Sequence, residues 1–300
     1  MSLNAGFTYT EIIGGRGAGL TVLAYLASRH GHTDEAGWRA RILEGRVLVD
    51  GQPAEAGARL RAGQSLAWIR PPWEEPDVPL AFEVLYEDED LVAVAKPTGL
   101  PTLPGAGFLE HTLLHQVRLR FPGASPSHRL GRGTTGIVLF TRNEAAGRIV
   151  SAAWREHRVT KVYRALVMGR PEQDAFAVET PIGRVAHAGL GQLHAADPAG
   201  KASRSDVAVL ERRSDSSLVD VAIATGRPHQ IRIHMAASGH PLVGDPLYAA
   251  GGHPIAGAVP GDLGYLLHAR LLSLVHPRTG ELLTVECPPP AALRTMGGDV

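Results

Sequence analysis

The chain has 300 residues, 44% of them hydrophobic, so it can bury at least one full core, and its length is typical of one to three domains. Its 30 basic and 30 acidic residues balance, which excludes a global positive field as the means of attracting nucleic acid. There is no apolar segment of membrane-spanning length and no signal-peptide pattern, and Cys287 is the only cysteine, so we expect a cytoplasmic protein without disulfides or membrane contact.

The first 70 residues predict a flexible start followed by a small helix-hairpin domain. Residues 1–19 end in a glycine-rich stretch without the Gly-Lys-Ser/Thr ending of a phosphate loop, so we expect them to be flexible. Within residues 20–70, apolar spacing predicts a helix over 20–31 and a second amphipathic piece from Trp38. Alternating valines around Asp50-Gly51 then predict a β-hairpin, and a further strand closes the domain.

A linker and a larger domain are predicted for the rest of the chain. Residues 71–79 contain four prolines, which exclude regular structure. Residues 80–300 combine strands and helices without a regular β-α-β rhythm, which predicts an α+β fold with a mixed, largely antiparallel central sheet flanked by helices. The predicted strands cover residues 82–96 as a pair, 137–140, 159–169, 203–212, 217–225 and 271–290 as a pair, and the predicted helices cover 144–157, capped by Asn143, and 227–239.

Local charge is uneven although the total is balanced. Residues 128–170 carry nine lysines or arginines against two acids, whereas residues 71–90 carry eight acids and no base. A basic stripe of this kind suits RNA binding, and a solvated helix face explains it equally well.

Three segments, residues 128–140, 161–167 and 225–248, place polar residues where core strands would not. In the first, an Arg/Gly/Thr-rich loop precedes an apolar strand, so its backbone can approach a ligand, or it can form a tight structural turn. In the third, Thr225 to Arg227 precedes a predicted helix, where free backbone amides and a guanidinium favour a phosphate or a carboxylate.

Together these segments resemble the RluA-type pseudouridine synthases, a family that modifies ribosomal and transfer RNA. Residues 128–136 match the signature His-Arg-Leu-Asp-x-x-Thr-Ser/Thr-Gly except at its aspartate. Residues 161–165 match Lys-x-Tyr-x-Ala, and residues 225–234 match Thr-Gly-Arg-x-His-Gln-Ile-Arg-x-His. The resemblance covers about residues 80–290, and several motifs in the family's order are far more specific than one short pattern.

The resemblance implies isomerisation of specific uridines in structured ribosomal or transfer RNA, without a cofactor or a metal, on a base flipped out of its RNA context. The family's catalytic aspartate falls at Gly131, Tyr163 would hold the base, and Arg227 would pair with the catalytic carboxylate. Residues 20–70 resemble the alpha-L RNA-binding module, which would face phosphates. The other signature residues are expected to bind substrate or RNA: His128, Arg129, Leu130, Arg132, Thr134, Thr135, Lys161, Thr225, His229, Gln230, Arg232 and His234.

Gly131 leaves three hypotheses open, because glycine offers neither a nucleophile nor a base. The protein is an inactive RNA binder with the same fold, it recruits a carboxylate such as Asp206, Asp220 or Asp245, or it belongs to a subgroup that tolerates glycine. In each case Arg227 loses its family partner, so a carboxylate already paired with Arg227 would favour recruitment.

The sequence gives no support for two other kinds of site. His111 and His115 are spaced four apart, but they lack the glutamate of His-Glu-x-x-His and a clear third ligand, so we expect no metal site. Serine and histidine occur without a Gly-x-Ser-x-Gly elbow, which leaves hydrolase chemistry without support.

Overall fold

The computed structural model describes residues 3–31, 33–188 and 190–297. The chain forms two compact units, Met1–Glu75 and Pro76–Val300, and the boundary between them falls inside the predicted linker, residues 71–79. Among the described residues, no helix is long and apolar enough to cross a membrane.

The first unit combines two helices with a four-stranded antiparallel sheet of order β1-β4-β2-β3. Thr21 and Asp34 cap the helices, since each side chain accepts a hydrogen bond from a backbone amide three residues further on. Trp38 and Val22, both fully buried, lie in a core shared by helices and strands. The elements are β1 (Phe7–Ile12), α1 (Val22–Arg29), α2 (Glu35–Leu43), β2 (Val47–Val49), β3 (Gln52–Pro53) and β4 (Ser65–Arg70).

The predicted helices, hairpin and closing strand of this unit are confirmed. Asp50 and Gly51 have φ of 50° and 80°, the left-handed pair that a two-residue hairpin turn requires. The prediction of a flexible segment over residues 1–19 was wrong at residues 7–12, because β1 pairs with β4 along its whole length. Local pattern did not reveal β1, since most of its side chains are exposed and its partner lies far along the chain.

The second unit is built on a ten-stranded sheet of order β10-β13-β14-β9-β17-β8-β6-β5, in which β18 also pairs with β17 and β7 with β8. Among the described strands of this sheet, β8 and β17 are the one pair that runs parallel, so the predicted mixed, largely antiparallel sheet is confirmed. Its strands are β5 (Glu83–Glu87), β6 (Leu91–Lys96), β7 (Ser125–Pro126), β8 (Thr135–Thr141), β9 (Thr160–Met168), β10 (Ala175–Val178), β13 (Ser205–Arg212), β14 (Ser216–Ile223), β17 (Leu267–Val275) and β18 (Leu282–Glu286).

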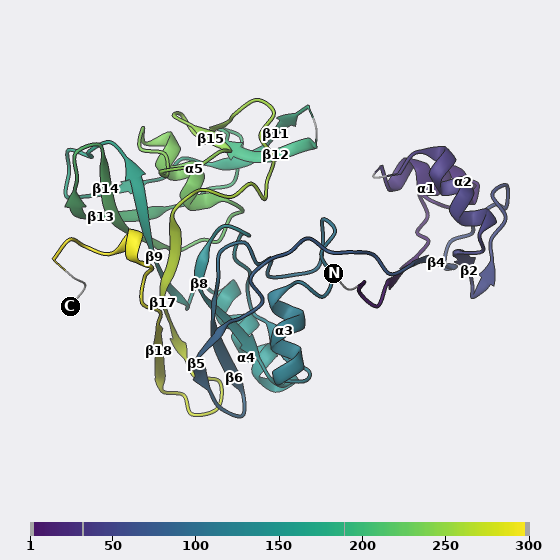
Figure 1. Ribbon diagram of the computed structural model, residues 1–300, viewed down its shortest axis with the longest axis horizontal. Helices are drawn as coiled ribbons and strands as arrows, with labels where there is room; N and C mark the ends of the chain where they lie inside the picture. The colour runs from purple at the N-terminus through teal and green to yellow at the C-terminus, as the bar shows by residue number, and fades with distance from the viewer. Residues whose placement is uncertain (1–2, 32, 189, 298–300) are drawn as a thin grey trace. The chain divides into compact units, whose positions relative to one another are not determined.

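Helices cover the sheet, and two small hairpins complete the unit (Figure 1). Asn143 caps α4 as predicted, because its side-chain oxygen accepts a hydrogen bond from the amide of Ala146 at 2.9 Å. The helices are α3 (Leu113–Arg120), α4 (Glu144–Arg155), α5 (Gln230–Ala237) and a 3₁₀ turn, η1 (Ala291–Leu293), and the hairpins pair β11 (Ile182–His187) with β12 (Gly191–Ala196) and β15 (Tyr248–Ala249) with β16 (His253–Pro254).

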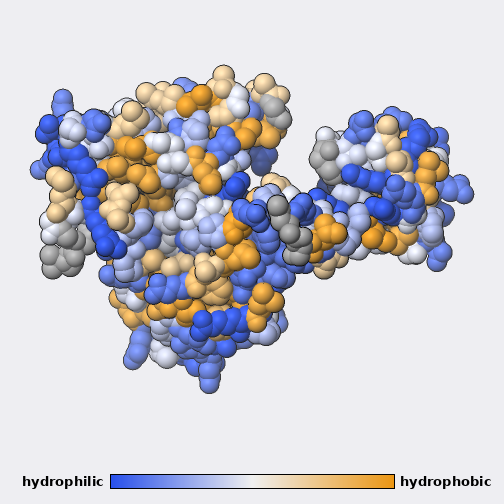
Figure 2. All heavy atoms as spheres, in the orientation of Figure 1, coloured by the Kyte–Doolittle hydropathy of each residue, from blue (hydrophilic) through white to orange (hydrophobic). Residues whose placement is uncertain are grey.

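In the middle of the sheet, at β6 and β8, both faces are buried, because successive side chains of a strand point to opposite faces. On β6, Leu91 packs in the core that contains α4, whereas Val92 packs in the core that contains α3. Tyr163 on β9 packs against the α3 core and also against the core that contains α5, so α3 and α5 cover the same face. In the view of Figure 2, the outer surface of this unit mixes hydrophilic areas with small hydrophobic ones.

Candidate active site

A cavity of about 720 Å³, here called the cleft, opens on the second unit where the α3 core meets the α5 core. It brings residues of all three signature segments together. They are Arg129, Leu130, Gly131, Arg132 and Thr134 from the first segment, Tyr163 from the second, and Arg227, His229, Gln230 and Arg232 from the third. Three segments that are far apart in the sequence therefore share one concave surface.

The loop of the first segment is held in place by a buried lysine. Lys96, at the end of β6, is 1% exposed, and its ammonium donates to three backbone carbonyl oxygens at 2.7 to 3.1 Å, one of them that of Arg132. Burial, with the nearby charge of Arg132, lowers the pKa of Lys96 to about 7. Thr102 donates to the carbonyl of Leu130 at 3.0 Å and accepts from its amide at 3.2 Å. These bonds fix the backbone on either side of Gly131.

Gly136 ties this loop to β17. It has φ of 103°, and a Cβ at this position would lie 2.2 Å from the carbonyl oxygen of Ala269, so only glycine permits the parallel approach of β8 to β17. Beside it, Thr135 bonds to Nδ1 of His268 at 2.8 Å, while Nε2 of His268 donates to the carbonyl of Cys287 at 3.0 Å. The segment before β17 is thereby brought against the signature loop.

Some signature residues are structural in their surroundings, because they do not line the cleft. Nε2 of His128 accepts from the amide of Leu139 at 3.0 Å, its ring packs 4.8 Å from that of Trp154, and burial lowers its pKa to about 3. The ammonium of Lys161 lies 5.0 Å from the centre of the Trp154 ring. His234 is fully buried. The three side chains support the strands and helix that carry the cleft.

The third segment is organised by Gln230. Its side-chain oxygen accepts from the hydroxyl of Thr225 at 2.7 Å and from the amide of Arg227 at 3.1 Å, so the loop folds back on the start of α5. His229, with φ of 57°, contacts the hydroxyl of Tyr248 at 2.7 Å, and burial lowers its pKa to about 4. The helix predicted over residues 227–239 therefore begins later, at Gln230.

Two arginines of this segment face the cleft in different ways. Arg232 forms two hydrogen bonds with Asp245, at 2.8 and 2.6 Å, and both side chains are almost fully buried. Nε of Arg227 is buried and has no hydrogen-bond partner in the described part of the chain, although Nη2 reaches the carbonyl of Ala202 at 3.4 Å. An anion arriving at Arg227 would satisfy a donor that is already desolvated.

Comparison with known proteins identifies the family. The profile described as RNA pseudouridylate synthase matches residues 90–237. A Synechocystis protein called an uncharacterized RNA pseudouridine synthase is 41% identical over 91% of this chain and 96% of its own length. Ribosomal large subunit pseudouridine synthase D of Neisseria meningitidis serogroup B is 33% identical over 93% of this chain and 77% of its own. The chain belongs to the RluA-type RNA pseudouridine synthases.

The fold of this pseudouridine synthase family member also matches a solved structure. Human RNA pseudouridylate synthase domain containing 1 aligns with a TM-score of 0.55 and 30% identity, over 72% of this chain and 87% of that one. The resemblance of the three segments to the family is therefore confirmed at the level of sequence and of fold.

None of the three carboxylates that the sequence suggested as substitutes lines the cleft. Asp245 is occupied by Arg232, Asp220 lies 2.6 Å from Arg164, and Asp206 lies 2.7 Å from Arg204. Among the described residues, Asp262 is the one carboxylate in the lining. In this structure, therefore, none of these three carboxylates is recruited to Arg227.

Sequence reasoning missed three residues of this region: Lys96, Asp262 and Tyr265. Lys96 had a usable signal, since it is a single cation at the end of an otherwise apolar strand. Asp262 and Tyr265 stand in a segment without regular structure shortly before Leu267-His268-Ala269. Tyr265 is 5% exposed, lines the cleft and shares a hydrogen bond of 3.1 Å with Thr134.

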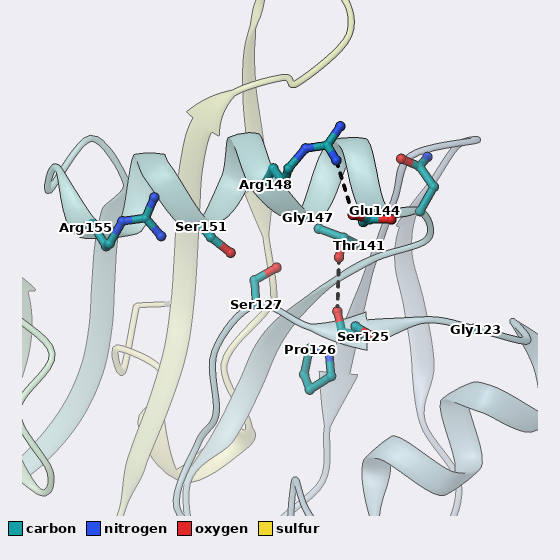
Figure 3. A pocket seen from close by; sticks show the side chains of 11 residues that line it. Gly123, Ser125, Pro126, Ser127, Thr141, Glu144, Gly147, Arg148, Ser151 and Arg155 are labelled. Carbon is teal, nitrogen blue, oxygen red and sulfur yellow. Dashed lines mark hydrogen bonds and ion pairs between the residues drawn. The ribbon is translucent and has the colours of Figure 1, made fainter.

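The basic residues of 128–170 do not form one stripe. Arg129 and Arg132 line the cleft, whereas Lys161 and Arg164 are buried. Two further arginines, Arg148 and Arg155, project from α4 over a second cavity of about 750 Å³, where Figure 3 shows Arg148 paired with Glu144. The stripe that the sequence indicated is distributed over separate surfaces.

Possible metal ligands gather at Asp88, Asp90 and His276, whose ligand atoms lie within 4.8 Å of one another. Arg278 donates to both oxygens of Asp90, at 2.5 and 2.9 Å, and His276 bonds to Asp88 at 2.7 Å. This group is satisfied as a network of ion pairs. His111 precedes the cap of α3, so it does not share a helix face with His115.

Proposed function

We propose that this protein isomerises uridine to pseudouridine in structured RNA. Family membership supports the reaction class, and the observation that carries the proposal is the cleft itself, which combines Tyr163, Arg227 and the loop around Gly131 in one cavity. A cavity of about 720 Å³ lined by apolar walls and a few charged groups suits a single extruded nucleoside.

Each cleft residue has a proposed role. The ring of Tyr163 is half-buried and would stack on the flipped base, and burial raises the pKa of its hydroxyl to about 12, so it stays protonated. Arg227 would bind a phosphate through its unpartnered Nε, and Arg129 and Arg132 would contact flanking phosphates. The reaction as proposed needs neither metal nor cofactor.

The remaining signature residues divide between contact and support. We assign substrate or RNA contact to Leu130, Thr134, His229 and Arg232, which line the cleft. Support roles go to the residues whose hydrogen bonds and packing hold the strands, the loop or the start of α5: His128, Thr135, Lys161, Thr225, His234 and Gln230, which also lines the cleft.

Large ribosomal RNA is the substrate class that we propose first. Relatives from Neisseria meningitidis and Pseudomonas aeruginosa carry the name ribosomal large subunit pseudouridine synthase D, and this chain covers most of their length. An activity on ribosomal RNA, together with a lone, buried cysteine, fits the cytoplasm. Transfer RNA is the second class to be tested.

We further propose that residues 20–70 form an alpha-L-like RNA-binding domain. The order of two helices and a hairpin supports this, as do the exposed arginines Arg29, Arg39, Arg59 and Arg61. Such a domain would add sequence-independent phosphate contacts, whose contribution weakens with salt.

The alternative is an RNA-binding protein that lost its catalysis, and Gly131 is the observation that favours it. Both hypotheses predict RNA binding, so only chemistry separates them. The purified protein is incubated with ribosomal and transfer RNA transcripts, and pseudouridine is quantified by mass spectrometry of the digested nucleosides. Pseudouridine at a defined position supports the synthase. Its absence from both RNA classes, with RNA binding retained, supports the inactive binder.

A further inference from the structure

Tyr265 occupies the space that a side chain at position 131 would need. A Cβ built on Gly131 lies 2.8 Å from the Tyr265 hydroxyl oxygen. A Cβ built on Gly133 lies 2.8 Å from Cε1 and 2.9 Å from Cζ of the same ring. Real Cβ atoms essentially never approach this closely, so the two glycines of the signature loop leave room for one tyrosine.

The hydroxyl of Tyr265 is also held at this place. Its oxygen lies 3.1 Å from the hydroxyl of Thr134, and the guanidinium carbon of Arg232 lies 4.0 Å from the centre of the ring. Arg232 is itself fixed by two hydrogen bonds to the buried Asp245. The ring is therefore held between Thr134 and Arg232, with its oxygen directed at Gly131.

We propose that the Tyr265 hydroxyl replaces the missing aspartate as the oxygen nucleophile of the reaction. The proposal rests on the synthase function proposed above. Tyrosine is chemically able to do this, since some glycosidases use it as the nucleophile at a sugar carbon. Glycine at 131 then leaves room for the phenol, and the phenol takes the role of the carboxylate that is missing there.

The reaction can be written without any co-reactant. The Tyr265 oxygen forms a bond to C1′ of the ribose while the C1′–N1 bond breaks, its electron pair stays on N1, and the phenolic proton moves to the released uracil. Uracil turns, and the C5–C6 double bond supplies the pair that joins C5 to C1′, while the pair of the C1′–O bond returns to the tyrosine oxygen. That phenolate takes the C5 proton, which yields pseudouridine and restores Tyr265.

Asp262 is the competing group, because it is the carboxylate in the lining of the described cleft. Its oxygen accepts from the amide of Val259 at 3.2 Å, within the same short segment. No side-chain contact joins it to the signature loop among the interactions of the described residues. Tyr265 is favoured because its hydroxyl oxygen lies 2.8 Å from the position of a Cβ built on Gly131. The variant Asp262→Asn tests the alternative nucleophile.

The first experiment measures single-turnover pseudouridine formation by the 300-residue chain. Tyr265→Phe keeps the ring over Arg232 and removes one oxygen, so we expect a loss of at least about 1,000-fold, with RNA affinity and melting temperature unchanged. Thr134→Val removes the same hydrogen bond but keeps the phenol, so we expect a loss of only about tenfold. Tyr86→Phe, which removes a hydroxyl bonded to Asp88 elsewhere in the sheet, is the matched control.

A second pair of variants does not depend on Tyr265→Phe folding. Gly131→Asp alone should lose activity, since its side chain meets the Tyr265 hydroxyl. Adding Gly131→Asp to Tyr265→Ala should recover at least about tenfold over Tyr265→Ala, because the carboxylate then has room.

The outcomes separate the two proposals. An active wild type with an active Tyr265→Phe overturns the role of Tyr265 and leaves the synthase intact, as does loss of activity in Asp262→Asn alone. A gain of activity in Gly131→Asp over the wild type, or no recovery in the double variant, also overturns it. A wild type inactive on every RNA overturns both.

Discussion

Arg227 and Arg232 come from one signature and line one cleft, yet they are in opposite electrostatic situations. Arg232 is paired with Asp245, and both side chains are almost fully buried. By contrast, Nε of Arg227 is buried and has no hydrogen-bond partner among the described residues. Arg232 therefore acts as a fixed part of the wall, and Arg227 is free to bind an incoming anion. The same division runs through the other signatures, where His128 and Lys161 support the strands while Arg129 and Tyr163 face the cavity.

The largest effect on stability is expected at the buried pair of Arg232 and Asp245. Asp245→Asn removes the partner of a buried guanidinium, so we expect the free energy of unfolding to fall by about 3 kcal/mol or more. Urea denaturation measures it. Asp206→Asn is the control, because its pair with Arg204 is half-exposed and should contribute less than about 1 kcal/mol. Equal losses of stability in the two variants would mean that the ion pair of Arg232 and Asp245 contributes no more than an exposed one.

A smaller effect, visible only in acid, is expected at His128. Burial lowers its pKa in the folded protein to about 3, below the ordinary value of 6.5, so the unfolded chain binds the proton more readily. Stability is therefore complete above pH 6.5 and falls as the pH drops, by about 2 kcal/mol at pH 5 from this group. His128→Gln should flatten the pH dependence of urea denaturation, and His253→Gln, at an exposed position, should not. Unchanged slopes in His128→Gln would contradict the assignment.

The smallest effect on stability is expected at Arg227, where binding changes instead. Arg227→Ala should leave the free energy of unfolding within about 0.5 kcal/mol. It should weaken RNA binding about tenfold and reduce the salt dependence by about one phosphate contact. Arg227→Lys should keep the salt dependence, because it keeps the charge. Fluorescence titration at several salt concentrations measures both. A loss of stability without a loss of RNA binding would mean that Arg227, like Arg232, is a structural part of the cleft wall.

The sequence predicted the parts of this molecule whose signal is local. Apolar alternation located β9, β13 and β14, and the asparagine before α4 marked its cap. The three signatures also indicated which segments meet, and the cleft contains all three. What the motifs did not separate is contact from support, because burial decides that, and burial depends on partners such as Trp154 that lie outside the motifs.

Long-range contacts explain what was missed. β1 forms through its pairing with β4, which local sequence does not reveal. In the same way, the role proposed for Tyr265 depends on its contact with Gly131, more than a hundred residues earlier in the chain. One signal was available: two glycines at 131 and 133 leave a volume that some other side chain must fill in a packed protein. The spacing alone did not say which one.

The most direct test follows the hydrogen at C5 of uridine, which must leave when C5 is joined to the ribose. Ribosomal RNA transcribed with tritium at uridine C5 is mixed with the 300-residue chain. We predict that tritium is released by the wild type in proportion to the pseudouridine formed, although position 131 is glycine, and that Tyr265→Phe releases it at least about 1,000-fold more slowly. No release by a folded, RNA-binding wild type from either ribosomal or transfer RNA would contradict the account.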